Sequence, residues 1–525
     1  MKNTLVISVL ALFVLSCGSS QKNISQKETS ETVDPTVFGS SITSSELKEM
    51  LYTYASDEFE GRETGEPGQK MAVEYLKQKY ISMGIASPLS GGNYFQKVPL
   101  EKQKSPDVSI SVNGNSFKVY DDYVSYGSSN TQTLSINDIV YVGYGIEDKN
   151  YSDYKNVDVK GKVVLIKAGE PKNEDGTYVT SNSTEPTKWV NGRQALTSKR
   201  NLAEEKGAKA MFLLDDEMFN RYSQYFKSQD ESGRSGRISL KSNTPEMLQF
   251  LISKNLAKAL YPNIYEDDKP QTVSVNLSVD VKSKSEQLDS ENVVAFIKGS
   301  EKPDEIIVIS AHLDHEGIKD GEVYNGADDD GSGTVAILEI AQAFQNAVNA
   351  GHTPKRSILF LHVTGEEKGL LGSRHYTDND PIFPLANTVV DLNIDMIGRV
   401  DDAHKDNRNF VYLIGSDKLS KELHNLSEEI NAKYTKINLD YTYNDENDPN
   451  RYYYRSDHYN FAKNNVPVIF YFNGTHADYH KPSDTPDKIQ YDLLETRTRL
   501  VFYTAWEIAN RDQRIKVDKV VIPSE

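Results

Sequence analysis

The sequence predicts an α/β fold in which helices cover both faces of a mostly parallel central sheet, with a β-rich α+β unit inserted into it. Length is one observation, because 525 residues exceed what one ordinary hydrophobic core supports. Another is a series of near-continuous apolar runs with helical patterns between or after them, at 293–297, 306–309, 358–363, 389–394, 410–414 and 468–472. Such runs are typical of strands buried on both faces, which occur mainly in parallel sheets.

The first residues have the features of an export signal. Lys2 precedes an apolar run from Leu5 to Leu15, which suits a secretory signal and is too short for a spanning helix. Cys17, the single cysteine of the chain, resembles the lipidated cysteine of bacterial lipoproteins. This resemblance implies a signal peptide over residues 1–16, a membrane anchor through a lipid on Cys17, and a place in the bacterial cell envelope, periplasmic or outer-membrane. The alternative is an ordinary signal peptide that ends near a cysteine.

A tether and two helices are expected before the insertion. Residues 17–40 are polar and indicate a flexible tether. Thr43 to Glu46 form a capping box that starts one helix, and Pro67 opens a second that ends near Gly84. The predicted units are 41–108 for the N-terminal helical part of the main domain, 109–285 for the insertion, 286–512 for the rest of the main domain and 513–525 for a C-terminal tail.

Charge and histidine distribution narrow the possible functions. The net charge of -18 argues against nucleic acid as a partner and against binding to anionic membrane surfaces. All ten histidines lie at or after His312. Chemistry that requires imidazole therefore belongs to the C-terminal half.

Five segments of that half end an apolar run with side chains that can bind metal ions. They are 311–315 (AHLDH), 326–333 (GADDDGSG), the doublet 366–367 (EE), 393–396 (NIDM) and 478–480 (DYH). In parallel α/β sheets, ligands bind at the carboxyl ends of the strands. Imidazole and carboxylate without thiolate suit zinc and related divalent ions. The absence of a His-Glu-x-x-His motif excludes a helical zincin site.

These motifs, in this order, resemble the M28 family of metallopeptidases, the co-catalytic dizinc aminopeptidases, over about residues 292–487. The resemblance implies a zinc-exopeptidase-like fold with two zinc ions per chain. Asp329 would bridge the two ions. His312 and Asp395 would complete one metal site, and Glu367 and His480 would complete the other.

The same resemblance assigns three residues to the chemistry. Glu366 would be the general base, which takes a proton from metal-bound water and passes it to the leaving amine. Asp314 would orient the imidazole of the first metal ligand. Tyr453 would help to hold the oxyanion, with Tyr452 and Tyr454 beside it as alternatives in register.

Other features of the family lead to further expectations. A non-proline cis peptide is expected between Asp329 and Asp330. Segments 157–166 and 204–210 resemble a protease-associated domain, which implies that the insertion influences substrate access. Three histidines are expected near the ligands and not among them, namely His315, His458 and His476.

The leading functional hypothesis is an exopeptidase that removes N-terminal residues from peptide substrates. A carboxypeptidase on the same fold stays open, because Arg399, Arg451 and Arg455 could bind a terminal carboxylate. A glutaminyl-cyclase-like enzyme would use a single metal ion, and the presence of both His312 and Asp395 argues against it. A non-catalytic binding protein would have lost ligands or the base, whereas all of them are present.

Overall fold

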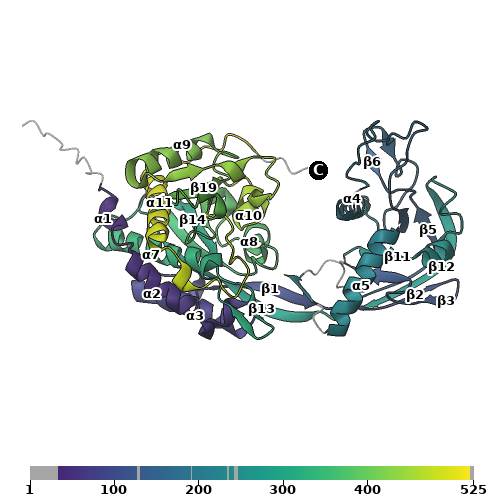
Figure 1. Cartoon of the computed structure of the whole chain (residues 1–525), viewed down its shortest axis with the longest axis horizontal. Coiled ribbons are helices and arrows are strands. Elements are labelled where there is room, and N and C mark those ends of the chain that lie inside the picture. The colour runs from purple at the N-terminus through teal and green to yellow at the C-terminus, as the bar shows by residue number, and fades with distance from the viewer. Residues whose placement is uncertain (1–32, 127–130, 191, 233–235, 242–245, 521–525) are drawn as a thin grey trace, which may run out of the picture.

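The computed structural model describes residues 33–126, 131–190, 192–232, 236–241 and 246–520. The chain forms two lobes that are joined by extended strands (Figure 1). The predicted signal peptide, Cys17 and most of the predicted tether lie outside the described residues. None of the helices in the described part of the chain combines the length and the apolar character needed to cross a membrane.

A nine-stranded sheet forms the middle of the larger lobe. Four neighbouring strand pairs are parallel and four are antiparallel, so the expectation of a mostly parallel sheet is wrong. Three of the parallel pairs lie side by side at the centre of the sheet. The order is β10 (Arg237–Leu240), β1 (Phe95–Gln103), β13 (Glu286–Ile297), β17 (Arg356–Val363), β14 (Lys302–His312), β18 (Thr388–Ile394), β21 (Val468–Phe472), β19 (Phe410–Ile414) and β20 (Asn438–Asp440).

The lengths of the connections explain much of this mixture of parallel and antiparallel strand pairs. Only residues 298–301 separate β13 from β14, and a parallel connection needs about a dozen residues or more. The two strands therefore run in opposite directions, and β13 is antiparallel to its neighbour β17. By contrast, α7 (Gly333–Asn349) lies between β14 and β17 in the chain and permits their parallel pairing.

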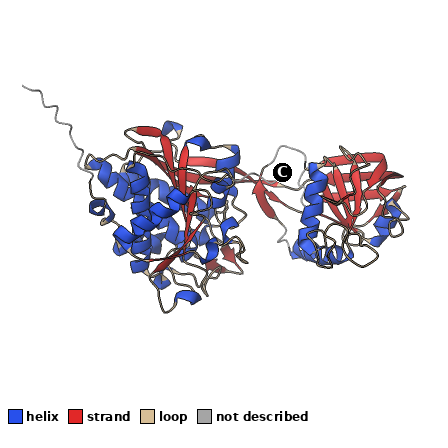
Figure 2. Ribbon diagram, turned by 90° about the horizontal axis from the view of Figure 1, so that it is seen from above, coloured by secondary structure: helices blue, strands red, loops and turns tan. Residues whose placement is uncertain are grey.

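Helices cover both faces of this sheet, as the sequence predicts (Figure 2). Alternate residues of β14 point into two different cores, with Ile307 and Ile309 on one face and Ile306 and Val308 on the other. The first face carries α1 (Thr36–Gly39), α2 (Ser44–Tyr54), α3 (Pro67–Met83), α7, α9 (Lys421–Ile430) and α11 (Tyr491–Asn510). The second face carries α10 (His458–Ala462), and α8 (Leu371–Arg374) lies beside it.

The local signals for the first helices are confirmed. The Thr43 hydroxyl accepts a hydrogen bond from the backbone N–H of Glu46 at 3.2 Å and donates one to the Glu46 carboxylate at 2.8 Å. Pro67 is the first residue of α3, and Gly84 caps its end with a left-handed φ of 74°. The start of α2 and both ends of α3 therefore lie where their capping residues predict.

The smaller lobe is an eight-stranded sheet with a core on each face. Helix α6 (Lys254–Leu260) packs on one face, and α4 (Gly192–Glu205) and α5 (Asp216–Ser232) pack on the other. The order is β3 (Asn115–Phe117), β2 (Asp107–Val112), β12 (Gln271–Lys282), β5 (Gln132–Tyr141), β8 (Val163–Lys167), β9 (Ala210–Leu214), β11 (Leu248–Ile252) and β4 (Tyr123–Ser125). Two-stranded ribbons join β6 (Glu147–Asp148) to β7 (Tyr151–Ser152) here, and β15 (Gly317–Lys319) to β16 (Glu322–Tyr324) in the larger lobe.

Short links connect the two sheets. Residues 104–106 lead from β1 into β2, and residues 283–285 lead from β12 back into β13. Strand β10 comes from within the inserted segment, yet it pairs antiparallel with β1 of the larger sheet. The smaller lobe is therefore attached by paired strands as well as by chain connectivity.

Candidate metal centre

The five predicted metal ligands converge at one edge of the larger sheet. His312 ends β14, and Asp395 follows β18 directly. Glu367 lies in the turn after β17, and His480 lies in the loop after β21. These four strands are parallel neighbours, so their carboxyl ends lie at the same edge. Asp329 reaches this edge from the irregular turn that leads into α7.

Asp329 lies between two groups of side chains. Its Oδ1 is 3.1 Å from Nε2 of His312, and its Oδ2 is 3.0 Å from Nε2 of His480. The His312 Nε2 is also 3.7 Å from Oδ1 of Asp395, and the His480 Nε2 is 3.2 Å from Oε2 of Glu367. The two sides of Asp329 thus correspond to the two ligand sets that the sequence predicts.

His315 joins the second group, although sequence reasoning placed it outside the ligand set. Its Nδ1 is 2.9 Å from Oε1 of Glu367 and 3.8 Å from Oδ2 of Asp329. The imidazole is fully buried, and its other ring nitrogen, Nε2, has no hydrogen-bond partner in the described part of the chain. His315, Asp329 and Glu367 therefore form a compact trio with ligand atoms within 4.8 Å of one another.

A hydrogen bond to a main-chain carbonyl oxygen orients the imidazole ring of His312. Its Nδ1 is 2.9 Å from the main-chain carbonyl oxygen of Asp314. A carbonyl can only accept, so Nδ1 carries the hydrogen and Nε2 presents its lone pair to the carboxylates. The group expected to orient this ring was the Asp314 carboxylate. That carboxylate instead accepts hydrogen bonds from the Thr64 hydroxyl at 2.6 Å and from the backbone N–H of Glu366 at 3.2 Å.

The turn that carries Asp329 is held by neighbouring carboxylates. Oδ2 of Asp484 accepts hydrogen bonds from the backbone N–H groups of Asp328 and Asp329 at 3.0 and 3.2 Å. His476, expected near the ligands, lies with Nε2 3.2 Å from Oδ2 of Asp328. The peptide bond from Asp329 to Asp330 is cis, as expected.

Glu366 lines a narrow cavity of about 30 Å³ together with Asp329 and Asp395. Burial raises the pKa of Glu366 well above its usual range. The His312 imidazole opposes this shift, and the nearby Glu367 and Asp395 carboxylates add to it. Most of the remaining wall is apolar or aromatic, and it consists of Met396, Tyr452, Arg455, Phe470, Phe472, Thr475 and Tyr479.

Tyr453 packs against the apolar cluster that forms the cavity wall and does not itself line the cavity. Its ring packs against those of His458 and Tyr459, with centroids 5.6 and 5.9 Å apart, and Tyr453 is not among the described residues that line the cavity. Tyr452 and Tyr479 do line it. The oxyanion role of Tyr453 stays a prediction.

The donor atoms of this centre fit divalent cations. Burial favours the neutral form of Asp329, but the adjacent His312 and His480 outweigh burial and hold its pKa well below the usual range. Burial lowers the pKa of His480, and Asp329 and Glu367 outweigh that effect and raise it to about 10. The carboxylates therefore attract positive charge. Nε2 of His312, Oδ2 of Asp329 and Oε1 of Glu367 are buried, and each faces a nitrogen or oxygen atom of another predicted or candidate ligand. Nitrogen and oxygen donors of this kind suit zinc.

Comparisons with known proteins show which families the chain is similar to. The family model described as Peptidase family M28 matches residues 292–505, a span that contains all five predicted ligands. A leucine aminopeptidase 2 from Arthroderma otae is 28% identical over 262 residues, which cover 45% of this chain and 48% of that protein. A glutamate carboxypeptidase 2 homolog from Caenorhabditis elegans is 31% identical over 154 residues, which cover 29% of this chain and 18% of that protein.

A solved structure described as an aminopeptidase from Aneurinibacillus is 18% identical and covers 93% of this chain and 99% of its own, with a TM-score of 0.49. The chain spans about half of the leucine aminopeptidase and under a fifth of the carboxypeptidase homolog. The chain is thus similar to peptidases of family M28 over residues 292–505, and both aminopeptidase and carboxypeptidase names occur among its relatives.

Proposed function

We propose that this chain is a zinc-dependent exopeptidase that removes N-terminal residues from peptides. The position of Asp329 carries the proposal, because its two oxygens face His312 on one side and His480 on the other. A carboxylate between two imidazole-carboxylate groups supports a two-metal centre with Asp329 as the bridging ligand. His312 and Asp395 would hold one zinc ion, and Glu367 and His480 the other, with His315 as a further donor.

Glu366 is suited to the role of general base. Two bound zinc ions would polarise the scissile carbonyl and make a bound water acidic. Glu366 would accept a proton from that water and pass it to the leaving amine. No hydrogen bond within the described chain engages its carboxylate, although its backbone N–H is anchored on Asp314. The carboxylate is therefore available for proton transfer and its main chain is held in place.

The cavity wall favours an apolar side chain at the residue that is removed. Met396, Phe470 and Phe472 supply apolar surface beside Glu366 and Asp395. The carboxylates of the centre would be attractive to the positively charged amino terminus of a peptide. Both features support cleavage after an apolar N-terminal residue.

A carboxypeptidase is the second candidate, because Arg455 also lines the cavity. Of the other two arginines that sequence reasoning considered, Arg399 is paired with Asp478 at 2.9 Å and lies 3.8 Å from Asp484. The guanidinium of Arg451 stacks on the Tyr454 ring at 4.7 Å. Arg455 lies 5.0 Å from the centre of the Tyr452 ring, and it is the one of these three arginines that lines the cavity.

Mass spectrometry of one peptide in three forms separates these candidates. The forms are free, N-acetylated and C-amidated, and each is incubated with the purified chain. Stepwise loss from the N-terminus of the free and amidated forms, stopped by a chelator, is the expected result. Loss from the C-terminus would establish the carboxypeptidase. No change in any form by protein that holds two metal ions would refute the peptidase proposal.

Two features outside the metal centre complete the proposal. We propose that the inserted lobe is a protease-associated domain that influences substrate access. We also propose export to the bacterial cell envelope with a lipid anchor on Cys17, on the basis of the pattern of residues 1–17. Metabolic labelling with a fatty-acid analogue should mark the chain and not its Cys17→Ser variant, and equal labelling of both would rule out this anchor.

A further inference from the structure

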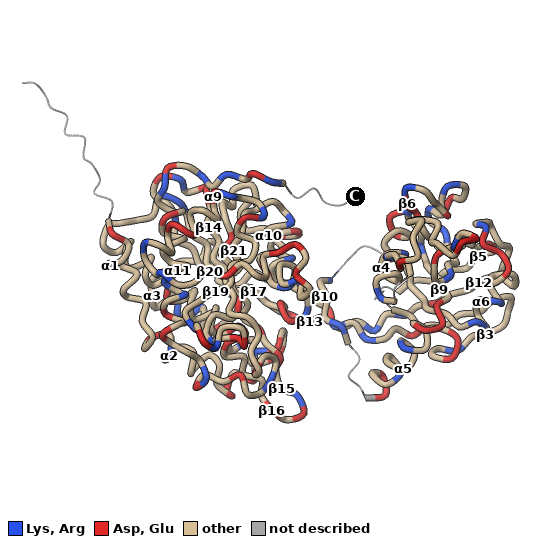
Figure 3. The backbone as a smooth tube through the Cα atoms, turned by 45° about the horizontal axis from the view of Figure 1, so that its top comes forward, with Lys and Arg blue, Asp and Glu red and all other residues tan. Residues whose placement is uncertain are grey.

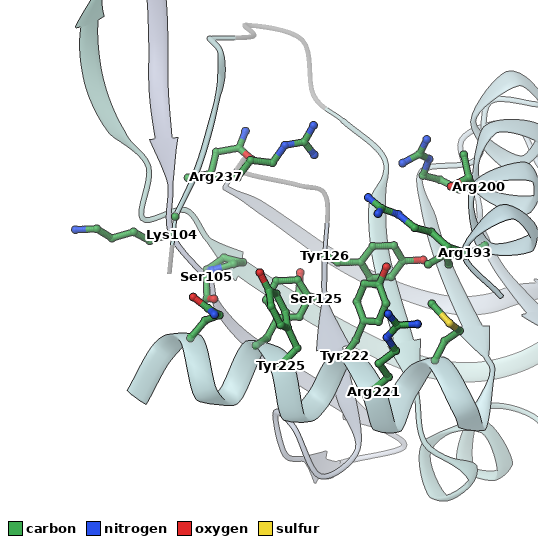
Figure 4. A pocket seen from close by; sticks show the side chains of 18 of the residues that line it. Lys104, Ser105, Ser125, Tyr126, Arg193, Arg200, Arg221, Tyr222, Tyr225 and Arg237 are labelled. Carbon is green, nitrogen blue, oxygen red and sulfur yellow. The ribbon is translucent and has the colours of Figure 1, made fainter. Parts of the chain in front are cut away.

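A second cavity, of about 910 Å³, lies where the inserted lobe meets the strands that attach it (Figure 4). Helices α4 and α5, the end of β4, β10 and the link from β1 to β2 line it. The larger lobe contributes Lys368, the residue that directly follows Glu367 of the metal centre. The volume is at the upper end of the roughly 300–1,000 Å³ typical of ligand sites. We call this cavity the arginine cleft, and its cations are Lys104, Arg193, Arg200, Arg221, Arg237 and Lys368.

The charge of the arginine cleft differs from that of the chain. None of its described lining residues is acidic, although acidic residues outnumber basic ones by 77 to 59 in the sequence. Elsewhere, residues of both signs are interspersed along the two lobes (Figure 3). A cluster of one sign repels itself, and an anion would relieve the repulsion. The cleft is therefore built for a negatively charged ligand.

The arginines of the cleft are available for such a ligand. Lys368 is paired with Glu63 at 3.2 Å, and Lys104 is paired with Glu286. By contrast, Arg193, Arg221 and Arg237 form no ion pair with another described residue. All three side chains are exposed to solvent. They line the same cavity from three separate elements, so each can contribute a guanidinium group to the binding of an anion there.

Hydroxyl groups and aromatic rings add specific contacts. Oγ of Ser125 and the hydroxyl of Tyr126 are buried and have no hydrogen-bond partner in the described chain. The Tyr126 and Tyr222 rings lie edge to face, with centroids 6.0 Å apart. Figure 4 shows Arg193 extending from α4 toward these two rings. Guanidinium groups bind carboxylates in a bidentate manner, and hydroxyl donors would complete the binding of the remaining oxygens.

We propose that the arginine cleft binds acidic residues of a peptide substrate, downstream of the bond that is cleaved at the metal centre. This inference rests on the proposed exopeptidase function. Lys368 connects the two places, because it lines the cleft and belongs to the same turn as Glu366 and Glu367. A peptide held at both would present its amino terminus to the metal centre and its acidic portion to the inserted lobe. The inserted lobe would then take part in the choice of substrate as well as in substrate access.

Direct binding tests the cleft without turnover. The full chain carrying Glu366→Gln is titrated into two fluorescent peptides that differ in one block, three Glu near the C-terminus or three Gln at the same positions. We expect about tenfold tighter binding of the Glu peptide at low salt, with loss of the difference as salt screens it. Arg193→Gln with Arg237→Gln should remove the difference, and Arg221→Gln alone should reduce it. Lys258→Gln with Lys269→Gln removes two exposed charges of the same lobe outside the cleft, and should preserve the difference.

The outcomes separate this inference from the function on which it rests. Equal binding of both peptides, or a Glu preference that survives Arg193→Gln with Arg237→Gln, would overturn the cleft proposal. If the wild-type chain cleaves both peptides with equal kcat/KM, the exopeptidase stands and the cleft fails. If the cleft binds the Glu peptide but no peptide is cleaved, the binding site stands and the proposed function fails. A competing single-stranded DNA of equal charge that displaces the Glu peptide at lower concentration would also overturn the choice of peptide as ligand.

Discussion

The hydroxyl of Ser456 donates a hydrogen bond to Oδ2 of Asp395 at 2.7 Å, in a buried contact. The same hydroxyl accepts a hydrogen bond from the side-chain amide of Asn393 at 2.9 Å. With one oxygen held, the other oxygen of Asp395 faces Nε2 of His312 at 3.7 Å. Ser456 therefore decides which oxygen of Asp395 is available to a metal ion.

Replacement of Ser456 by Ala should weaken metal binding on the His312 side of the centre. Loss of an outer contact to a metal ligand typically lowers affinity by about 10–100-fold. Zinc affinity is measured by competition with a coloured chelator, with Ser111→Ala in the inserted lobe as the matched control. Unchanged affinity in Ser456→Ala would show that Asp395 keeps its orientation without this hydroxyl.

The adjacent carboxylates Glu366 and Glu367 should respond differently to the same substitution. Glu366→Gln should retain metal and lower peptide turnover by about 10²–10⁴-fold, because a positioned general base contributes that much. Glu367→Gln should lose metal, since its Oε2 faces His480 at 3.2 Å and its Oε1 faces His315 at 2.9 Å. Metal content by elemental mass spectrometry and turnover by peptide mass spectrometry are measured on the same samples. Equal metal loss in both variants would contradict the assignment of separate roles.

His315 should contribute to metal binding on the second side of Asp329. His315→Ala removes a buried imidazole whose Nδ1 is 2.9 Å from Glu367, and we expect fewer than two bound zinc ions at limiting zinc. His458→Ala is a matched control, because that imidazole is also fully buried and contacts none of the predicted ligands by an ion pair in the described chain. If both variants bind two ions with wild-type affinity, His315 is not a ligand.

Arg62 should be essential for the stability of the larger lobe. Its fully buried guanidinium donates to the carbonyl oxygens of Tyr54, Leu313, Asn325 and Gly326 at 2.7 to 3.1 Å. Arg62→Ala leaves several buried carbonyls unsatisfied and should destabilise the chain by about 3 kcal/mol or more. Arg408→Ala removes an exposed partner of Asp492 and should cost under about 1 kcal/mol. Thermal unfolding of both variants checks the difference, and similar melting temperatures would contradict it.

Much of the larger lobe could be predicted, because local sequence patterns indicate its strands and the position of its metal ligands. The apolar runs of β14, β17, β18 and β21 indicate buried strands, and ligands at their ends indicate a site at one edge of a sheet. The expectation of a mostly parallel sheet was wrong, and β13 is one of the strands that pair antiparallel, because an apolar run does not show which way a strand runs. The short link 298–301 contained the missing information.

Contacts between distant segments were harder to predict. His315 follows His312 by three residues, and nothing in the sequence shows that the chain turns its imidazole toward Glu367. Thr64, Ser456 and Asp484 lie far along the sequence from the residues that they contact, Asp314, Asp395 and Asp329, and their residue types are common on any surface. The cations of the arginine cleft come from α4, α5, β10, the link after β1 and the turn after β17, so no local motif exists. Such groupings form only when the chain folds, and the sequence alone does not show them.

His362 should make the larger lobe less stable in acid. Its imidazole on β17 is fully buried, with Nε2 2.7 Å from the Tyr80 hydroxyl, and burial lowers its pKa to about 3. The unfolded value is about 6.5, so the neutral form is favoured in the fold, and the contribution of His362 is complete above pH 6.5 and is lost as pH falls toward 3. Between pH 7 and pH 5 this loss amounts to about 2 kcal/mol. Urea unfolding of metal-free protein at both values should show that His362→Gln loses less stability than wild type, while the exposed control His352→Gln matches wild type. An equal loss in wild type and His362→Gln would mean that the buried imidazole is not what makes the fold sensitive to acid.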